Sequence, residues 1–354
     1  MDAEADFTGT VPLTGDERLN EAALARWMAG HVEGFAGPLT LAKFKGGQSN
    51  PTYRVATSDK SYVLRRKPFG PLLPSAHAVE REHRLIAALH PTGFPVARPY
   101  GLCEDDGVIG SAFYIMEMVE GRTLWDGALP GMEPQERTAT YHAMVDTLAD
   151  LHAVDVDAVG LADYGKPGSY FARQVGRWTK QYRAAETDDL PAMERLIEWL
   201  PATLPDQTRS GIVHGDYRID NLIYAADEPR IAAVLDWELS TLGDPMADLS
   251  YLLMHWFVPS EGRAGLLGKD LGALGIPTAE AMAERYATRT GLSTVPPLDW
   301  YFAFGQFRLA SIVQGIKRRA LDGNASSVEA EAMGEQVPII ADAAWDFAVK
   351  AGAE

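Results

Sequence analysis

The stretch that decides the fold is GIVHGDYRIDNLIYAADEPRIAAVLDWELSTLGDP, Gly211–Pro245. Its apolar, strand-like runs are interrupted by polar side chains, among them His214, Asp216, Asn221 and Asp236. A polar group that is buried without a partner costs about 1–3 kcal/mol. The stretch therefore predicts a cleft in which these side chains meet a ligand that needs them.

The spacing of Asp216 and Asn221 repeats the H-x-D-x-x-x-x-N spacing of a kinase catalytic loop. In such a loop the Asp accepts a proton from the attacking hydroxyl and the Asn ligates Mg²⁺. Asp236 follows the apolar run IAAVL, where it would close a two-strand hairpin facing the loop as a second ligand for Mg²⁺, which prefers hard oxygens. Asp and Asn are also common turn residues, but the joint spacing favours phosphoryl transfer.

Three neighbours of these residues receive separate interpretations. We expect His214 to pack and hydrogen-bond the loop rather than to transfer protons. Arg218 stands two residues after Asp216 and is either close to the transferring phosphate or an ordinary surface arginine. Asp244, followed by Pro245, is typical of a helix cap.

The composition excludes several classes of protein. The chain has 354 residues, 46% of them hydrophobic, enough for a substantial core. Its net charge of −17 argues against a nucleic-acid or anionic-membrane partner. Cys103 is the only cysteine, and no apolar run approaches the roughly 20 residues of a membrane span. We expect a cytoplasmic protein, and its oligomeric state stays open.

The first third of the chain predicts a small antiparallel sheet with helices. Thr14–Glu17 resembles a capping box before a helix, and Leu39–Pro68 contains three strand-like runs. A helix capped by Ser75 would carry Glu82 on its apolar face, and two more strands would end with Ser111–Val119.

The rest of the chain is mainly helical in pattern. The fold class that follows is α+β and bilobal: a small sheet lobe, residues 1–119, and a larger helical lobe, residues 120–354. Ligands commonly bind between such lobes.

Several motifs together resemble the aminoglycoside phosphotransferase-like kinase superfamily, which has a protein-kinase-like fold. They are GGQSNPTYRV, YVLRRKP, AHAVERE, YIMEMVEGRTL, VHGDYRIDNL and VLDWELSTLGDPMADLSY. A narrower resemblance, in GLADYGKPGSY and PAMERLIEWLP among others, is to the kinase-like module fused to some acyl-CoA dehydrogenases.

The resemblance implies ATP and Mg²⁺ as cofactors and assigns further residues. The phosphate loop would be formed by Gly46, Gly47, Ser49 and Asn50. Arg65 stands where most of these kinases have a lysine, with Glu82 as its partner. Backbone groups of Glu117 and Val119 would meet adenine, and Asp248 would brace the catalytic loop by accepting its N–H groups.

The acceptor is expected to be a small-molecule hydroxyl, because only seven residues separate Asp236 from Asp244 and leave no platform for a peptide. Arg173, Arg177 and Lys180 recur at helical spacing, either as a solvated face or as a stripe for an anionic acceptor. The narrower resemblance implies a hydroxyacyl-CoA, such as a 4-hydroxyacyl-CoA. Two alternatives stay open: an aminoglycoside kinase, and a nucleotide-binding protein without turnover.

Overall fold

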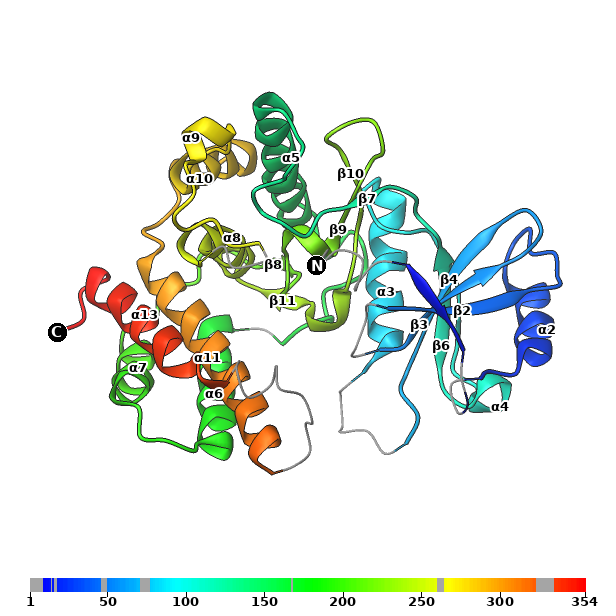
Figure 1. Cartoon of the computed structure of the whole chain (residues 1–354), viewed down its shortest axis with the longest axis horizontal. Helices are drawn as coiled ribbons and strands as arrows, with labels where there is room; N and C mark the ends of the chain where they lie inside the picture. The colour runs from blue at the N-terminus through cyan, green and yellow to red at the C-terminus, as the bar shows by residue number, and fades with distance from the viewer. Residues whose placement is uncertain are drawn as a thin grey trace.

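The structure is a computed structural model that describes residues 9–13, 15, 18–45, 50–70, 77–166, 168–259, 264–322 and 334–354. A sheet with its helices forms one lobe, and a larger, mainly helical part forms the other (Figure 1). Gly46, Gly47, Ser49, Ser75, Thr14 and Glu17 lie outside the described residues.

The small lobe contains a sheet that, among the described residues, has six strands in the order β1-β2-β3-β4-β6-β5, each antiparallel to its neighbour. The bounds are β1 Thr10–Pro12, β2 Thr40–Phe44, β3 Thr52–Ala56, β4 Ser61–Arg66, β5 Pro99–Cys103 and β6 Phe113–Glu117. Leu39–Pro68 thus contains the three strands expected from its pattern.

Two longer helices lie against this sheet, α2 Glu21–His31 and α3 Val79–Leu89, while the short helices α4 Asp106–Ile109 and η2 His90–Thr92 sit at its connections. Figure 1 shows α3 on the side that faces the larger lobe and α2 on the far side. Because side chains alternate along a strand, Leu64 of β4 packs in the core under α2, while Arg65 faces Glu82 of α3.

Both helices begin differently from the sequence expectation. The first starts at Glu21, where the side chain of Asn20 accepts a hydrogen bond from the N–H of Ala23 at 3.0 Å. The second starts at Val79, and Ala78 at its N-cap makes no side-chain cap bond. Asparagine is as good an N-cap as threonine, so Asn20 places the first helix later than the Thr14–Glu17 motif suggested.

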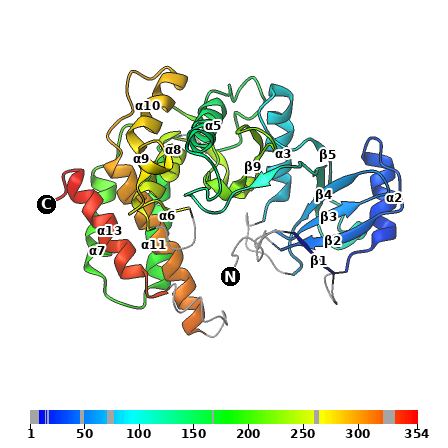
Figure 2. The same ribbon diagram turned by 45° about the horizontal axis from the view of Figure 1, so that its top comes forward.

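The larger lobe is built from helices around short strands. The helices are α5 Pro134–His152, α6 Tyr170–Ala185, α7 Pro191–Ala202, α8 Met246–Leu253, α9 Leu271–Leu274, α10 Ala279–Thr290, α11 Asp299–Leu321 and α13 Val337–Lys350, with the 3-10 turns η3 Ile219–Asn221, η4 Trp237–Leu239 and η5 Met254–Phe257. Figure 2 shows α6, α7, α11 and α13 gathered at the end of the molecule opposite α2.

Short strands in this lobe position the Gly211–Pro245 stretch. β9 Leu222–Tyr224 pairs with β10 Ile231–Val234 and with β7 Arg122–Thr123, and β8 Gly211–Val213 pairs with β11 Thr241–Gly243. The expected hairpin before Asp236 is therefore present. The polar residues of the stretch lie where these strands end.

The hydrophobic core crosses the connection between the lobes. Val79, Leu85, Ile86 and Leu89 of α3 belong to the same buried cluster as the core of the larger lobe. A second cluster lies between the sheet and α2. Within the described ranges, no helix combines the length and apolar character that crossing a bilayer requires.

Candidate active site

The loop after β8 is held by a buried carboxylate on α8. Asp248 accepts the N–H of His214 at 2.6 Å and that of Gly215 at 2.8 Å, and His152 Nε2 lies 3.3 Å from the same carboxylate. Burial alone would raise the pKa of Asp248, but His152 and the backbone donors outweigh it and lower the pKa. The expected brace on the loop is present.

Gly215 allows the loop to turn sharply at this point. Its φ is +84°, and a Cβ added to it would lie 2.9 Å from the carbonyl oxygen of Leu239. An L-residue pays about 1–2 kcal/mol for a left-handed conformation, which glycine adopts freely. Glycine is thus required here by both conformation and space.

His214 has a structural role, as expected. Its Nε2 lies 2.8 Å from the carbonyl oxygen of Leu235, and its Nδ1 lies 3.2 Å from the N–H of Asp216. A carbonyl can only accept and an N–H can only donate, so the imidazole is neutral with its proton on Nε2. His214 is fully buried and packs against Trp237.

Asp216 is the one carboxylate of this loop with donors on both oxygens. Tyr251 donates to Oδ1 at 2.8 Å, Asn221 Nδ2 donates to Oδ2 at 2.9 Å, and Arg218 Nε lies 3.4 Å away. Its side chain is 22% exposed. The carboxylate is therefore oriented by the protein and still reachable by a small molecule.

Arg218 is paired on two sides. Besides Asp216, its Nη1 lies 2.8 Å from Oδ2 of Asp220. Burial raises the pKa of Asp220, against the pull of Arg218. The structure thus places Arg218 next to the candidate catalytic carboxylate rather than on an open surface.

Asn221 and Asp236 lie at the same end of the β9–β10 hairpin, just before β9 and just after β10. The N–H of Leu235 donates to the carbonyl of Asn221 at 2.8 Å. Asp236 has φ 61° and ψ 67°, a left-handed conformation that costs a non-glycine residue about 1–2 kcal/mol and that is concentrated at functional sites. This backbone turns the Asp236 carboxylate toward the small lobe, where it meets Arg65.

Arg65 joins the two lobes. Its Nε lies 2.8 Å from Oε2 of Glu82 and its Nη2 donates to Oδ1 of Asp236 at 2.7 Å, while Oε2 of Glu238 lies 3.5 Å away. Burial works against its charge, but Glu82 and Asp236 outweigh burial and raise the pKa of Arg65. The guanidinium stays charged and brings Asp236 to the edge of the sheet.

Glu82 is buried, and each of its two carboxylate oxygens accepts a hydrogen bond. Its Oε1 accepts from Asn50 Nδ2 at 2.8 Å and its Oε2 from the Tyr114 hydroxyl at 3.1 Å. Burial raises the pKa of Glu82 to about 7, against the effect of Arg65. Asn50, expected on the phosphate loop, is itself buried and also contacts His77 Nδ1 at 2.9 Å, so its amide supports Glu82.

The remaining sequence candidates lie at the end of β6 and on α6. The N–H of Glu117 donates to the carbonyl of Arg98 at 2.8 Å within the sheet lobe, and Val119 follows just after β6. On α6, Arg173 Nη1 donates to the carbonyl of Gly168 at 2.8 Å. Arg177 and Lys180 of the same helix are exposed.

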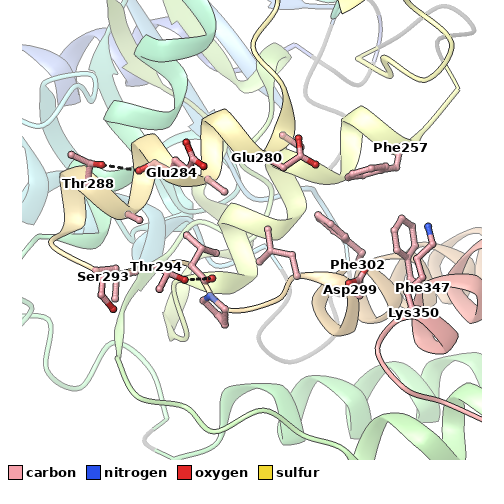
Figure 3. A pocket seen from close by; sticks show the side chains of 17 residues that line it. Phe257, Glu280, Glu284, Thr288, Ser293, Thr294, Asp299, Phe302, Phe347 and Lys350 are labelled. Atoms are coloured by element: carbon pink, nitrogen blue, oxygen red, sulfur yellow. Dashed lines mark hydrogen bonds between the residues drawn. The ribbon is translucent and has the colours of Figure 1, made fainter.

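A cavity of about 810 Å³ lies elsewhere in the large lobe, between α10 and the residues around the start of α11 (Figure 3). Glu280 and Glu284 of α10 stand on one side, and Phe302 and Phe347 on the other. It does not include Asp216 or Asp236. This cavity and the cluster of residues around Asp216 are therefore different places.

Three contributors were not identified from the sequence. Tyr251 reaches Asp216 from 35 residues away, His152 reaches Asp248 across 96, and Arg308 donates to the carbonyl of Gly215 across 93. Each lies on a helix outside the motif around Asp216. A polar residue on an otherwise apolar helix face was the only available signal.

The two-lobed fold, with a buried Arg–Glu pair on the sheet lobe and an H-G-D loop facing it, defines a protein of the protein-kinase-like class. The model of the phosphotransferase enzyme family matches residues 40–287, and the chain belongs to that family.

Two relatives are acyl-CoA dehydrogenase family proteins. Mouse (Mus musculus) acyl-CoA dehydrogenase family member 10 is 46% identical over 346 residues, 97% of this chain and 32% of that protein. Human (Homo sapiens) family member 11 is 40% identical over 330 residues, 92% of this chain and 42% of that protein. The chain thus spans less than half the length of these curated relatives.

Two solved structures show the same fold. A Ralstonia eutropha protein described as a candidate aminoglycoside phosphotransferase is 50% identical with a TM-score of 0.87, covering 94% of this chain and 99% of that one. A thermostable mutant of aminoglycoside phosphotransferase APH(4)-Ia, in complex with AMP-PNP and hygromycin B, has a TM-score of 0.59 at 15% identity, covering 92% of this chain and 97% of that one. The expected superfamily and its bilobal fold are confirmed.

Proposed function

We propose that the chain is an ATP-dependent O-phosphotransferase whose acceptor is the hydroxyl of a small molecule. The observation that carries the proposal is the continuous cluster at the lobe junction. Asp216 is hydrogen-bonded to Asn221, Asn221 lies against Leu235, and Asp236 pairs with Arg65. Phosphoryl transfer requires such positioning and charge more than covalent chemistry by the protein.

In this proposal Asp216 accepts the proton of the acceptor hydroxyl. The acceptor O–H bond breaks as its proton passes to the Asp216 carboxylate, and an O–P bond forms to the γ-phosphorus. The bond from that phosphorus to its bridging oxygen breaks, and ADP leaves. Arg218, beside Asp216, is placed to offset negative charge on the transferring group.

The residues present fit a magnesium ion. Asp236 offers a carboxylate that is 32% exposed, and Asn221 offers an amide oxygen, both hard donors. In the described part of the chain no cluster of three or more His, Cys, Asp or Glu could hold a metal. Mg²⁺ fits such a sparse set because it takes its other oxygens from water and phosphates, whose charge it neutralises when bound.

The short segment after Asp236 supports a small acceptor. η4 follows at once, and β11 then pairs back to β8, so the chain returns to the core. Protein kinases use a long activation segment here to hold a peptide. We propose that the acceptor enters from the helical side of the large lobe.

We propose a hydroxyacyl-CoA, such as a 4-hydroxyacyl-CoA, as the acceptor. Cations support this choice, because Arg218 and Arg308 lie beside the catalytic loop and α6 carries Arg173, Arg177 and Lys180. The naming of the relatives as acyl-CoA dehydrogenase family members supports the same class. The Ralstonia structure, described as a candidate aminoglycoside phosphotransferase, favours an aminoglycoside as the second candidate.

A screen of ATP consumption tests these candidates. Purified protein with Mg-ATP is assayed against 4-hydroxyacyl-CoAs, 3-hydroxyacyl-CoAs and a panel of aminoglycosides. Asp216→Ala should lose most of the turnover and keep nucleotide binding, whereas Asp236→Ala should weaken Mg-ATP binding itself. Thermal shift with Mg-ATP measures that binding. Nucleotide binding without any Asp216-dependent turnover would instead identify a catalytically silent protein.

We further propose residues 1–119 as the nucleotide-binding lobe and 120–354 as the catalytic and acceptor-binding lobe, in a protein of the cytoplasm. The single cysteine and the acidic composition are consistent with that compartment.

A further inference from the structure

The carboxylate of Asp216 is oriented by a residue with no part in the kinase loop motif. Tyr251 donates to its Oδ1 at 2.8 Å, opposite the Asn221 bond to Oδ2. Tyr251 lies on α8, the helix that also carries Asp248. One helix therefore holds both the backbone of the catalytic loop and the side chain of its candidate base.

The Tyr251 hydroxyl can act only as a donor toward Asp216. Burial, and then the negative charge of Asp216, raise the pKa of Tyr251 above its ordinary value. The phenol stays protonated at neutral and moderately alkaline pH, so its hydrogen bond to the Asp216 carboxylate persists over that pH range.

Arg308 of α11 holds the other side of the same structure. Its Nη2 donates to the carbonyl of Gly215 at 2.8 Å. Its guanidinium carbon lies 5.4 Å from the ring centre of Tyr251 and 5.5 Å from that of Trp178 on α6, within reach of cation–π attraction. Gly215 is thus held at its N–H by Asp248 and at its carbonyl by Arg308.

These contacts surround a small cavity beside the catalytic loop. Tyr170, Tyr251, Phe304 and Arg308 line it, and Gly215 borders it. The helices that meet there are α6, α8 and α11. In the proposed function, cations of α6 and α11 would hold the acceptor.

We propose that Tyr251 and Arg308 are positioning residues for the phosphoryl-transfer step. Tyr251 orients the Asp216 carboxylate toward the acceptor hydroxyl, and Arg308 fixes the Gly215 peptide relative to α6 and α11. This inference rests on the proposed function. The inference requires that substitution of Tyr251 or Arg308 lower turnover and leave Mg-ATP binding intact.

Tyr251→Phe tests the first role because it removes one hydroxyl and nothing else. We expect kcat for the acceptor to fall roughly 10- to 100-fold, as for a displaced catalytic group, with KM for Mg-ATP within about twofold. Tyr182→Phe is the matched control, since Tyr182 is buried on α6 and its hydroxyl has no hydrogen-bond partner among the described residues. A Tyr251→Phe enzyme with wild-type kcat would overturn the proposal.

Arg308→Lys tests the second role while it keeps the charge. We expect a partial loss of kcat with unchanged KM for Mg-ATP, because one ammonium cannot both reach the Gly215 carbonyl and stack on two rings. Arg195→Lys, another arginine over an aromatic ring, Trp345, is the control. A change in KM for Mg-ATP with kcat unaltered would contradict the positioning role.

A measurement without turnover separates this inference from the proposed function. With ¹³C-carboxyl-labelled aspartate, the Asp216 resonance is assigned by its absence in Asp216→Asn. Tyr251→Phe should shift it, and Tyr182→Phe should not. If the wild type phosphorylates none of the acceptors, the proposed function fails, while this spectrum still decides whether Tyr251 orients the Asp216 carboxylate. An unchanged Asp216 resonance in Tyr251→Phe would contradict the inference even if the wild type is an active kinase.

Discussion

Arg65 is the residue at which the chain departs from the usual lysine, and the structure shows what the guanidinium does. Three of its nitrogens reach three partners: Glu82, Asp236 and, at 3.4 Å, the hydroxyl of Thr52. A lysine has one compact ammonium for the same task. The junction of the two lobes is therefore held by a forked guanidinium rather than by a single ammonium.

Arg65→Lys should consequently weaken nucleotide binding. We expect KM for Mg-ATP to rise roughly tenfold, equivalent to about 1.4 kcal/mol of lost contacts, with a smaller change in kcat, measured by steady-state kinetics. Arg66→Lys is the matched control, because Arg66 contacts Tyr53 and Phe69. A KM at or below the wild-type value would show that the guanidinium is dispensable.

We expect Glu82 to make the stability of the protein depend on pH. Its pKa is raised from an ordinary 4.5 to about 7, so between these values the folded state holds a proton that the unfolded state has released. The free energy of unfolding therefore falls as pH rises through this window. Urea unfolding at pH 5 and pH 7.5 should show this fall, and Glu82→Gln should flatten it.

The control is Glu80→Gln on the same helix, whose partly exposed carboxylate pairs with Lys67. It should keep the wild-type slope. Identical slopes for the wild type and Glu82→Gln would contradict the assignment of the pH dependence to Glu82.

The catalytic loop is the element on which the site depends most. Gly215→Ala forces an L-residue into φ +84° and presses its Cβ against Leu239. We expect a loss of at least about 1–2 kcal/mol of stability from the backbone alone, measured by urea unfolding, and a loss of most turnover.

Gly291→Ala is the matched control for that variant. Gly291, at the end of α10, has φ +69° with nothing within 4 Å of an added Cβ. It should lose stability from backbone strain and keep its activity. Equal activity in the two alanine variants would contradict a special role for the loop conformation.

Elements with strong local patterns could be predicted from the sequence. The strands of Leu39–Pro68, the hairpin before Asp236 and the apolar face of α3 with Glu82 all follow from periodicity. Short strands such as β7 and β11 could not be predicted, because two or three residues carry no period. Tyr251 and Arg308 could not be assigned either, since their partners lie on other elements far along the chain.

At the scale of the whole molecule, α3 ties the lobes together. Arg81 Nη2 donates to the carbonyl of Tyr164 at 2.8 Å, and its guanidinium lies 4.2 Å from the centre of the Tyr164 ring. Arg84 forms an exposed ion pair with Asp163 on the same connection. These contacts, with the shared core around Leu85, fix Glu82 relative to the catalytic loop.

Arg81→Ala should loosen this connection. We expect faster amide hydrogen exchange in α3 and a KM for Mg-ATP raised roughly three- to tenfold, the worth of a cation–π contact with one hydrogen bond. Arg84→Ala should change KM by less than about twofold, because exposed ion pairs contribute about 0–1 kcal/mol. Equal effects of the two variants on KM would contradict the expected difference between Arg81 and Arg84.

The most direct test of the central claim is a crystal structure of the wild-type protein with AMP-PNP and magnesium. We expect the nucleotide between the lobes, with Asp236 and Asn221 on the metal and the Asp216 carboxylate facing the terminal phosphate. A nucleotide bound elsewhere, or an Asp216 carboxylate directed away from that phosphate, would contradict the account.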